Sequence, residues 1–599
     1  MSILPVLLGL LAAVLLFSGI DDFIPVLICF LHRVRGRRKE GTSSTGSPDL
    51  PERRIAIFVP CWMEYGVIAN MVRHNLSVIK YRNFDFFLGV YPNDEKTSTV
   101  ATELSRSYRN VHVAVCARPG PTSKADCLNN IFRRMVEVER ELDCYFDTVV
   151  LHDAEDLVHP DALATINRER ERYAMVQVPV LPLPTPFTEF THAIYCDEFA
   201  EFQTIDMRAR GFSGSFVPSN GVGTGFARAI LDRLGEERGI VFDPVSLTED
   251  YEIGVYIHRA GYPQIFVPLR GMSRKIVATR EYFPRRMRSA IRQRTRWVTG
   301  ITLQGWERDG WRGKFAVKYW FWRDRKGVAA NPLGLLTNIL FVYGIIDFAE
   351  SAAQHRPWAF ATNNPVIMRL CFLTFLLQCF RIALRMACVS RIYGVPFALG
   401  VPLRTLHGNL INCSASFRAV YSYFHAKRNR RHVAWLKTDH AYPTRTALPT
   451  QRRELPDVIL SSGLVSEHDL AALQSQLSAQ HELEDFLLAQ RLVSEDELCH
   501  ALSLQSGLPV TSVDLAALNP RVSQSLPARA QKDFNVVPYR IEKGQLLVAG
   551  SRVPLPEVLE ELKKFTQLPI EFRLVTRKHF REIQAALQPE DAMALLVAD

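Results

Sequence analysis

The sequence lacks paired cysteines. Its 11 cysteines stand singly, with no C-x-x-C pair and no spacing typical of a metal finger. A disulfide framework and a structural zinc site both need such pairs or clusters, so the sequence indicates neither. Reduced cytosolic thiols are the interpretation that fits.

The N-terminus lacks the marks of a cleaved signal peptide. No charged region precedes the apolar run at 3–20, and no small-residue cleavage site follows it. The run is about long enough to span a bilayer, and Asp21 and Asp22 separate it from a shorter apolar stretch at 23–31. We therefore favour an uncleaved membrane anchor over residues 1–39 rather than a signal peptide.

A nucleic-acid-binding motif is also missing, although the net charge is +10. Lys and Arg gather beside apolar segments, as at 32–39, rather than along one predicted face. Basic residues that follow an anchor place the next domain in the cytoplasm. The charge pattern thus predicts a membrane partner and no nucleic-acid partner.

A chain of 599 residues needs two or more folded units. After a polar linker at 40–52, short apolar runs at 55–59, 84–91, 111–115 and 148–152 alternate with helical segments such as 68–78. This alternation predicts an α/β domain over 53–325 with a mostly parallel sheet covered on both faces. Ligands of such sheets bind beyond the carboxyl ends of the strands.

Two further regions follow the predicted α/β domain. Apolar segments at 333–348, 365–384 and 395–401 are interrupted by Arg369, Arg381, Arg385 and Arg391, so we expect one or two spans plus interfacial helices within 331–425, before a basic stretch at 427–431. Residues 453–590 predict a small α+β domain. It opens with a weak repeat, 455–470 against 483–498, in which Ser466 and Ser494 cap helices, and continues with a hairpin at 536–549 and a helix at 555–565.

Acidic residues follow the predicted strand at 148–152. The run D-A-E-D places Asp153, Glu155 and Asp156 where a buried strand ends. Clustered carboxylates repel one another, and a divalent cation that also binds a diphosphate relieves the repulsion. The alternative is an acidic loop that caps the next helix.

Two other motifs carry groups suited to chemistry. Thr248, Glu249 and Asp250 open a predicted helix; they are either a cap that favours the helix dipole or, through Asp250, a base for an acceptor hydroxyl. Residues 293–297 (QRTRW) place two guanidinium groups, an amide and an indole in about one helical turn. They form either an amphipathic membrane-surface helix or a diphosphate clamp with an aromatic platform.

Together these motifs resemble the family 2 inverting glycosyltransferases, to which cellulose and hyaluronan synthases belong. The resemblance covers about 54–310 and rests on the order of 60–64 (PCWME), 93–94 (ND), 123–126 (SKAD), 153–156 (DAED), 248–250 (TED) and 293–297 (QRTRW). It implies a GT-A fold, a nucleotide-sugar donor, most simply a UDP-sugar, and Mg²⁺ or Mn²⁺.

The resemblance also assigns roles to individual residues. It places Glu64, Asp94, Lys124 and Asp153 at the nucleotide and makes Asp250, with Glu249 beside it, the catalytic base. Metal binding falls to Asp153 with Asp156 or Glu155, because D-A-E-D departs from the usual D-x-D. Gln293, Arg296 and Trp297 become the clamp at the diphosphate and acceptor, and 221–225 (GVGTG) either the loop that shapes the acceptor site or an ordinary glycine-rich turn.

More narrowly, residues 116–129, 152–156, 179–183 and 280–284 resemble the bacteriophage adsorption protein B type. That type implies a bacterial inner-membrane, multi-pass enzyme with a cytoplasmic catalytic domain. It also implies a polysaccharide acceptor and an outer-membrane export partner.

The C-terminal region resembles the N-terminal domain of type II secretion ATPase E, some relatives of which bind cyclic di-GMP. Here acids, Glu454 and Glu482, stand where the binding motif opens with arginine, and we expect no cyclic di-GMP binding. The rival to an enzyme is a catalytically silent membrane scaffold or receptor that retains the fold.

Overall fold

A computed structural model describes residues 3–36, 50–269, 276–430, 442–443, 453–466, 468–470 and 480–587. Several predicted segments fall partly outside these residues, among them the basic cluster (37–39), the linker (40–49), the second basic stretch (Arg431) and the C-terminal domain with its repeat (467, 471–479 and 588–590). The chain divides into two compact units, one of residues 1–71, 85–99 and 113–447, the other of 72–84, 100–112 and 448–599. The predicted domain boundaries stay predictions.

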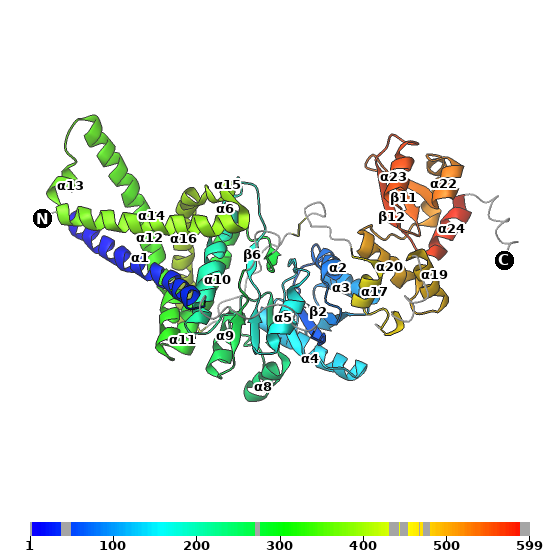
Figure 1. Ribbon diagram of the computed structural model, residues 1–599, viewed down its shortest axis with the longest axis horizontal. Helices are drawn as coiled ribbons and strands as arrows, with labels where there is room; N and C mark the ends of the chain where they lie inside the picture. Colours follow the sequence, from blue (N-terminus) through cyan, green and yellow to red (C-terminus); the bar gives the residue numbers. More distant parts are fainter. Residues whose placement is uncertain are drawn as a thin grey trace. The chain divides into compact units, whose positions relative to one another are not determined.

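A seven-stranded sheet forms the centre of the α/β domain, in the order β3-β2-β1-β4-β7-β5-β8 (Figure 1). Its strands are β1 (Ile55–Pro60), β2 (Phe84–Val90), β3 (Val111–Val115), β4 (Thr148–Leu151), β5 (Met175–Gln177), β7 (Thr224–Ala227) and β8 (Gln264–Phe266). β1 pairs with β4 in parallel, as β5 does with β8, whereas β7 is antiparallel to both β4 and β5. The predicted α/β class and mostly parallel sheet are confirmed.

The central strands are buried on both faces. Every residue of β2 and β4 is buried, which explains why these strands appear as continuous apolar runs rather than alternating ones. The helices of this domain are α2 (Ile68–Val78), α3 (Glu95–Ser107), α4 (Lys124–Leu142), α5 (Ala162–Arg170), α8 (Arg228–Arg238) and α9 (Glu249–Arg259). The bounds of α2 are those the sequence predicts.

Two helical segments with π-helical turns stand between the sheet and the membrane region. α6 (Phe190–Glu201) runs through η1 (Phe202–Asp206) into α7 (Met207–Phe212), and α10 (Met287–Trp297) runs through η3 (Val298–Gln304) into α11 (Gly305–Asp309). A small sheet pairs β6 (Val180–Pro182) with β9 (Thr279–Glu281) in parallel. Turns of this type recur at functional sites, because they re-aim the side chains around them.

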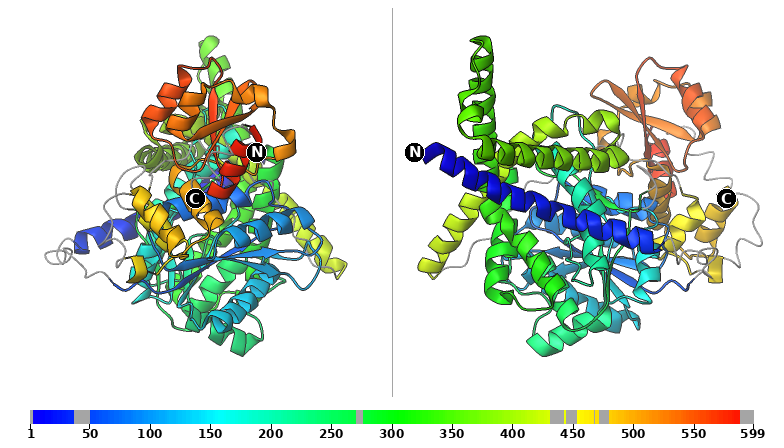
Figure 2. Two further views of the ribbon diagram at one scale, coloured as in Figure 1. Left: turned by 90° about the vertical axis from the view of Figure 1, so that its right-hand side faces the viewer. Right: turned by 60° about the vertical axis from the view of Figure 1, so that its left-hand side comes forward.

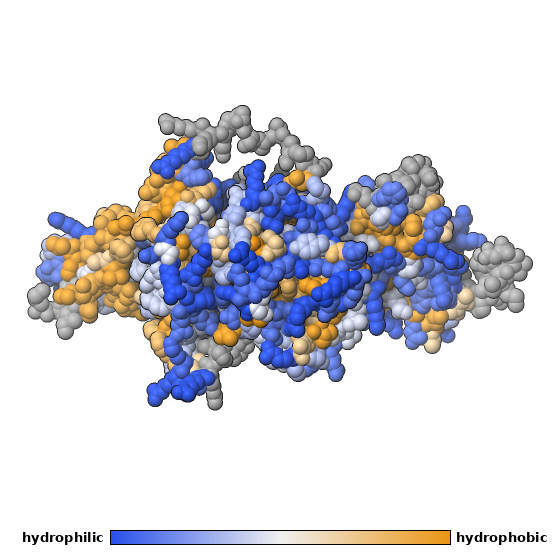
Figure 3. Space-filling view, turned by 90° about the horizontal axis from the view of Figure 1, so that it is seen from below, coloured by the Kyte–Doolittle hydropathy of each residue, from blue (hydrophilic) through white to orange (hydrophobic). Residues whose placement is uncertain are grey.

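Among the described residues, three helices are long and apolar enough to cross a membrane: α1 (Ile3–Gly36), α12 (Phe315–Ala353) and α14 (Pro365–Tyr393). α1 and α14 pack side by side (Figure 2). Large apolar side chains stay exposed on all three, including Phe17, Ile339 and Phe372, and Figure 3 shows them gathered at one end of the molecule. Such a surface suits lipid rather than water. The chain is therefore a membrane protein.

α1 is one continuous helix, whereas the sequence suggested two apolar segments divided by Asp21 and Asp22. These aspartates are held by cations of other helices: Lys326 Nζ lies 2.6 Å from Asp21 Oδ2, and Arg381 Nη1 lies 3.0 Å from Asp22 Oδ2. Arg323 also bonds both aspartates. Because the charges are paired, they do not interrupt the helix.

Some arginines of the later helices also pair with carboxylates. Arg385 Nε of α14 lies 2.5 Å from Glu201 Oε2. Arg404 of α16 (Val401–Arg428) is fully buried and makes two bonds, of 2.7 and 2.8 Å, to the carboxylate of Asp197. The remaining helices of this region are the short α13 (Ala359–Asn363) and α15 (Val395–Ala398).

The C-terminal residues form the predicted helical repeat and a small sheet. The helices α17 (Leu455–Ser461), α19 (Gln480–Ala489) and α20 (Glu495–Ser506) precede the hairpin of β10 (Val536–Glu542) and β11 (Gln545–Gly550), which is completed by β12 (Ile570–Leu574), α23 (Pro556–Lys563) and α24 (Arg577–Leu587). Gly463 and Arg491, at matching repeat positions, both have positive φ, of 66° and 54°. Ser494 forms a capping box, and Ser466 Oγ accepts from Asp469 N. The two copies of the repeat therefore share one structural motif, a turn residue with positive φ followed by a serine cap.

Candidate active site

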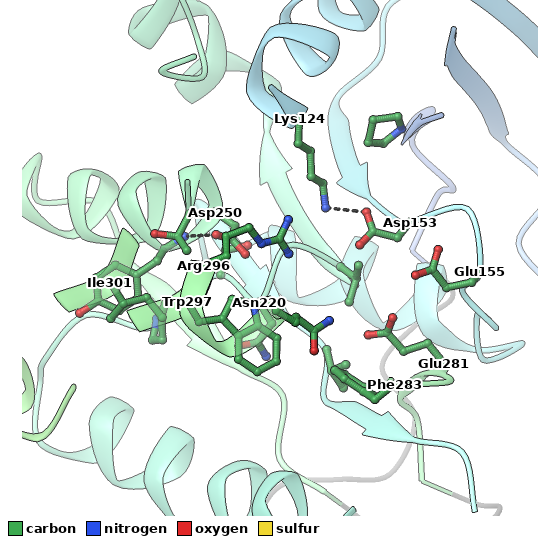
Figure 4. Close-up of a pocket in the computed structure, with 18 of the residues that line it drawn as sticks. Lys124, Asp153, Glu155, Asn220, Asp250, Glu281, Phe283, Arg296, Trp297 and Ile301 are labelled. Carbon is green, nitrogen blue, oxygen red and sulfur yellow. Dashed lines mark hydrogen bonds and ion pairs between the residues drawn. The ribbon is translucent and has the colours of Figure 1, made fainter. Parts of the chain in front are cut away.

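A cavity of about 420 Å³ opens where the strands β1, β2 and β4 end. Eight of the residues singled out from the sequence line it: Glu64, Lys124, Asp153, Glu155, Asp250, Gln293, Arg296 and Trp297. Figure 4 shows Lys124, Asp153 and Glu155 on one side and Asp250, Arg296 and Trp297 on the other. Asp94, Asp156 and Glu249 do not line it.

Asp94 supports the turn that carries Glu64. Its Oδ2 accepts from Met63 N at 2.5 Å, and its Oδ1 accepts from Thr97 N at 3.3 Å. Thr97 Oγ1 in turn accepts from Glu64 N at 3.0 Å. Asp94 therefore fixes the backbone around Met63, which has a positive φ of 57°. Its predicted contact with the nucleotide stays a prediction.

Lys124 places a half-buried cation inside the cavity. It is the first residue of α4, whose N-cap Ser123 accepts from Asp126 N. Its Nζ lies 2.5 Å from Asp153 Oδ1 and donates to Gly221 O at 3.4 Å. Burial alone would lower the pKa of Lys124, but Asp153, Glu249 and Asp250 raise it above its ordinary value. The ammonium stays charged and suits a diphosphate.

The acidic loop sends its carboxylates in two directions. Asp153 and Glu155 face the cavity, whereas Asp156 is fully buried, 2.6 Å from His152 Nδ1, and accepts from Asp153 N. Burial, with Asp153 and Glu155 nearby, raises the pKa of Asp156 well above its usual range, and burial lowers the pKa of His152 to about 3. Asp156 and His152 therefore form a buried, hydrogen-bonded pair beneath the loop.

A metal site stays a prediction. Among the described residues, no three His, Cys, Asp or Glu side chains converge as a metal-binding group. Asp153 and Glu155 nevertheless fit the chemistry of Mg²⁺ or Mn²⁺, because such ions are held by one or two carboxylates together with substrate phosphates. The alternative of an acidic helix cap is not supported, because the next helix, α5, begins after Asp161.

Asp250 stands at the opposite wall, against a glycine. Gly221 has a φ of +77°, and a β-carbon there would lie 2.6 Å from Asp250 Oδ2, so only glycine fits. The hydroxyl of Thr248 makes no capping hydrogen bond; the side chain packs against Gly300 instead. The motif at 248–250 thus does more than cap α9, because it brings Asp250 to the cavity.

The QRTRW motif lies in α10, and its polar side chains point in two directions. Gln293, Arg296 and Trp297 line the cavity, while Arg294 turns away and pairs with Glu198 at 2.7 Å. The indole of Trp297 packs against a cluster of aromatic rings, namely Tyr195, Phe199 and Phe283. This arrangement matches a clamp and platform rather than a membrane-surface helix alone.

The Glu249 and Asp250 carboxylates should impose a pH dependence. Burial, then the Asp250 charge, raises the pKa of Glu249 to about 7, and burial raises the pKa of Asp250. If Asp250 acts as a base, kcat/KM should fall toward acid pH as Asp250 takes up a proton, and at a higher pH than for an ordinary aspartate. Replacing Glu249 with Gln removes a like charge and lowers the pKa of Asp250, so this acid limb should move to lower pH.

The test is a rate profile at saturating metal from pH 5.5 to 8.5 for wild type and Glu249→Gln. Saturating metal keeps proton competition for the metal ligands out of the profile. An acid limb that stays in place in the variant, or moves to higher pH, would contradict the coupling between the two carboxylates.

Several residues that line the cavity were not predicted from the sequence. Asn220 and Glu281 lie among the labelled side chains of Figure 4, and Arg210 and Asp324 line the cavity too. Glu281 sits in the stretch 280–284, which carried part of the resemblance without an assigned role. Asn220 immediately precedes the glycine-rich loop. Arg210 and Asp324 had no sequence pattern that marked them.

Comparisons with known sequences identify relatives of the whole chain and of two of its domains. The profile of the family described as "Glycosyltransferase like family 2" matches residues 51–300, and that of the MshEN domain matches 506–594. The chain is 33% identical over 593 residues to bacteriophage adsorption protein B of Escherichia coli (strain K12), which covers 95% of this chain and 79% of that protein. The figures are the same for bacteriophage N4 adsorption protein B of Escherichia coli O157:H7.

Solved structures show weaker overall likeness. The mannosyltransferase PcManGT from Pyrobaculum calidifontis, in complex with GDP-Man and Mn²⁺, is 16% identical, with a TM-score of 0.42. The match covers 69% of this chain and 99% of the mannosyltransferase chain. A structure of MshE with cdg is 23% identical, with a TM-score of 0.19, and covers 22% of this chain and 96% of its own.

Proposed function

Because the chain belongs to the bacteriophage adsorption protein B family and carries a family 2 glycosyltransferase domain, we propose that it transfers a sugar from a nucleotide-sugar donor. The donor is a UDP-sugar, the acceptor is a growing surface or exported polysaccharide, and the sugar inverts in a single displacement. One observation carries this proposal: a single cavity holds a half-buried cation, two carboxylates at a strand end and a separate half-buried aspartate.

The residues of the cavity divide the chemistry between them. Lys124 and Arg296 offset the charge that develops on the leaving diphosphate. Asp250, on the opposite wall, accepts the proton of the attacking hydroxyl. Asp153 and Glu155 are the carboxylates that would hold a divalent cation, which when bound stabilises negative charge on the leaving group. Trp297 offers an aromatic face to a sugar ring.

The membrane region sets the surroundings of the reaction in this proposal. Three spans, α1, α12 and α14, anchor the enzyme in a bacterial inner membrane with the catalytic domain in the cytoplasm. The product leaves with an outer-membrane export partner. The C-terminal domain, 453–590, serves as an interaction or assembly module, and cyclic di-GMP does not bind it.

The experiment is nucleoside diphosphate release by the full chain in detergent. A panel of nucleotide sugars is tested with Mg²⁺, with Mn²⁺ and with chelator. We expect metal-dependent release from one donor, which identifies the sugar. The buried Asp156–His152 pair, which withholds one acidic side chain from the cavity, favours the alternative of a silent scaffold. Absence of release from every donor, with an export partner present, would support that alternative.

A further inference from the structure

The loop of residues 219–224, here called the Ser219–Thr224 loop, is shaped by one buried amide. Gln177 is fully buried, and its Oε1 accepts from Asn220 N at 2.8 Å and from Thr224 Oγ1 at 2.6 Å. Its Nε2 donates to Val178 O and Val222 O at 2.7 and 3.0 Å. The side chain thus satisfies backbone groups of the loop that no neighbouring strand bonds, and it fixes the loop against β5.

The same loop connects the two walls of the cavity. Gly221 O accepts from Lys124 Nζ, and a β-carbon on Gly221 would lie only 2.6 Å from Asp250 Oδ2. On the proposed function, Lys124 faces the donor diphosphate and Asp250 faces the acceptor hydroxyl. The group that lies between these two walls is therefore the sugar in transfer.

Asn220 lines the cavity together with Ser219 and Val222 of the same loop, and it is the only one of the three with a side-chain amide. Figure 4 shows its amide among Glu281, Trp297 and Arg296. Its Nδ2 is buried, and no hydrogen-bond acceptor reaches it from the described residues. The backbone of the same residue is bonded to Gln177, so the amide is held in place. A buried donor without an acceptor is unfavourable in a folded protein unless a ligand completes it.

We propose that the Asn220 amide donates a hydrogen bond to an oxygen of the transferred sugar, a hydroxyl or acyl oxygen of a hexose, and so selects among donors that share one nucleotide. This rests on the proposed function. Asn220 is a specificity residue, because it touches the sugar and not the diphosphate. Gln177 is a positioning residue, because it acts through the backbone of Asn220.

The test compares wild type with Asn220→Ala and Asn220→Asp across sugars carried by the same nucleotide. Asn220→Asp keeps the shape but replaces the donor by an acceptor. For the preferred sugar, kcat/KM should fall by about 10-fold to 100-fold in both variants. For the other sugars kcat/KM should fall by much less, so the ratio of kcat/KM between the preferred sugar and the others becomes smaller. The affinity for free nucleoside diphosphate should not change.

Two arms separate the possible origins of a loss. Hydrolysis of the donor without acceptor should fall as transfer does; unchanged hydrolysis with a raised acceptor KM would place Asn220 at the acceptor and overturn the proposal. An equal loss for all sugars, or no loss, would also overturn it. Asn429→Ala, an exposed residue after α16, is the matched control and should leave every rate unchanged. A wild type silent with every donor would refute the proposed function itself.

Discussion

Replacing Asp250 with Asn is expected to lower turnover by about a thousandfold or more while nucleotide-sugar binding survives. The amide keeps the shape of the carboxylate beside Gly221 but cannot accept the proton of the acceptor hydroxyl. The binding groups for the donor, Lys124 and Arg296, stand on other elements and are not altered. Nucleoside diphosphate release measures turnover, and calorimetric titration with a non-hydrolysable donor measures binding.

The control for Asp250→Asn is the same exchange at an exposed acid. Asp533 pairs only loosely with Arg529, at 3.5 Å, in the C-terminal domain, and Asp533→Asn should leave both quantities unchanged. Loss of binding together with turnover in Asp250→Asn would show that Asp250 maintains the cavity rather than acting as the base.

Replacing Glu155 with Gln should have the second largest effect on turnover. Glu155 faces the cavity, so the exchange removes a carboxylate from the proposed metal site. Metal-dependent turnover should fall by about 100-fold, and the Mn²⁺ concentration for half-maximal rate should rise. Titration of the rate with Mn²⁺ and Mg²⁺ measures both changes.

Asp156→Asn provides the comparison that assigns the ligand. Burial raises the pKa of Asp156 well above its usual range, and Asn keeps the shape of the side chain without its charge. The metal dependence should persist, and the free energy of unfolding should fall by about 1–3 kcal/mol, because the bonds to His152 and Asp153 N are disturbed. The opposite pattern, with Asp156→Asn losing metal dependence and Glu155→Gln retaining it, would assign the metal to Asp156.

The sequence predicts the sheet well because its central strands are buried on both faces. The run at 55–59 is short and apolar, and the buried strand β1 forms there. The run at 111–115 also forms a strand, β3, although this edge strand is only partly buried. The acidic and basic motifs follow strand ends or open helices, so their meeting at one edge follows from parallel topology. Eight of the residues singled out therefore line one cavity.

The direction of individual side chains could not be predicted. The same short motif sends Glu155 into the cavity and Asp156 beneath it, which depends on the fold of the loop and on His152. Asp94 is taken up by two backbone N–H groups. Arg210 and Asp324 reach the cavity from helices that are far apart in the chain. No local sequence pattern predicts that these two residues come together.

The paired aspartates of α1 bear on how the protein is made. Asp21 and Asp22 leave the ribosome about 300 residues before Arg323 and Lys326, the cations that offset them. Two uncompensated carboxylates oppose entry of a helix into lipid. α1 therefore cannot settle in the bilayer as a finished element by itself. Its stable insertion is coupled to the arrival of α12 and α14, so α1 is secured only after these two later helices have been made.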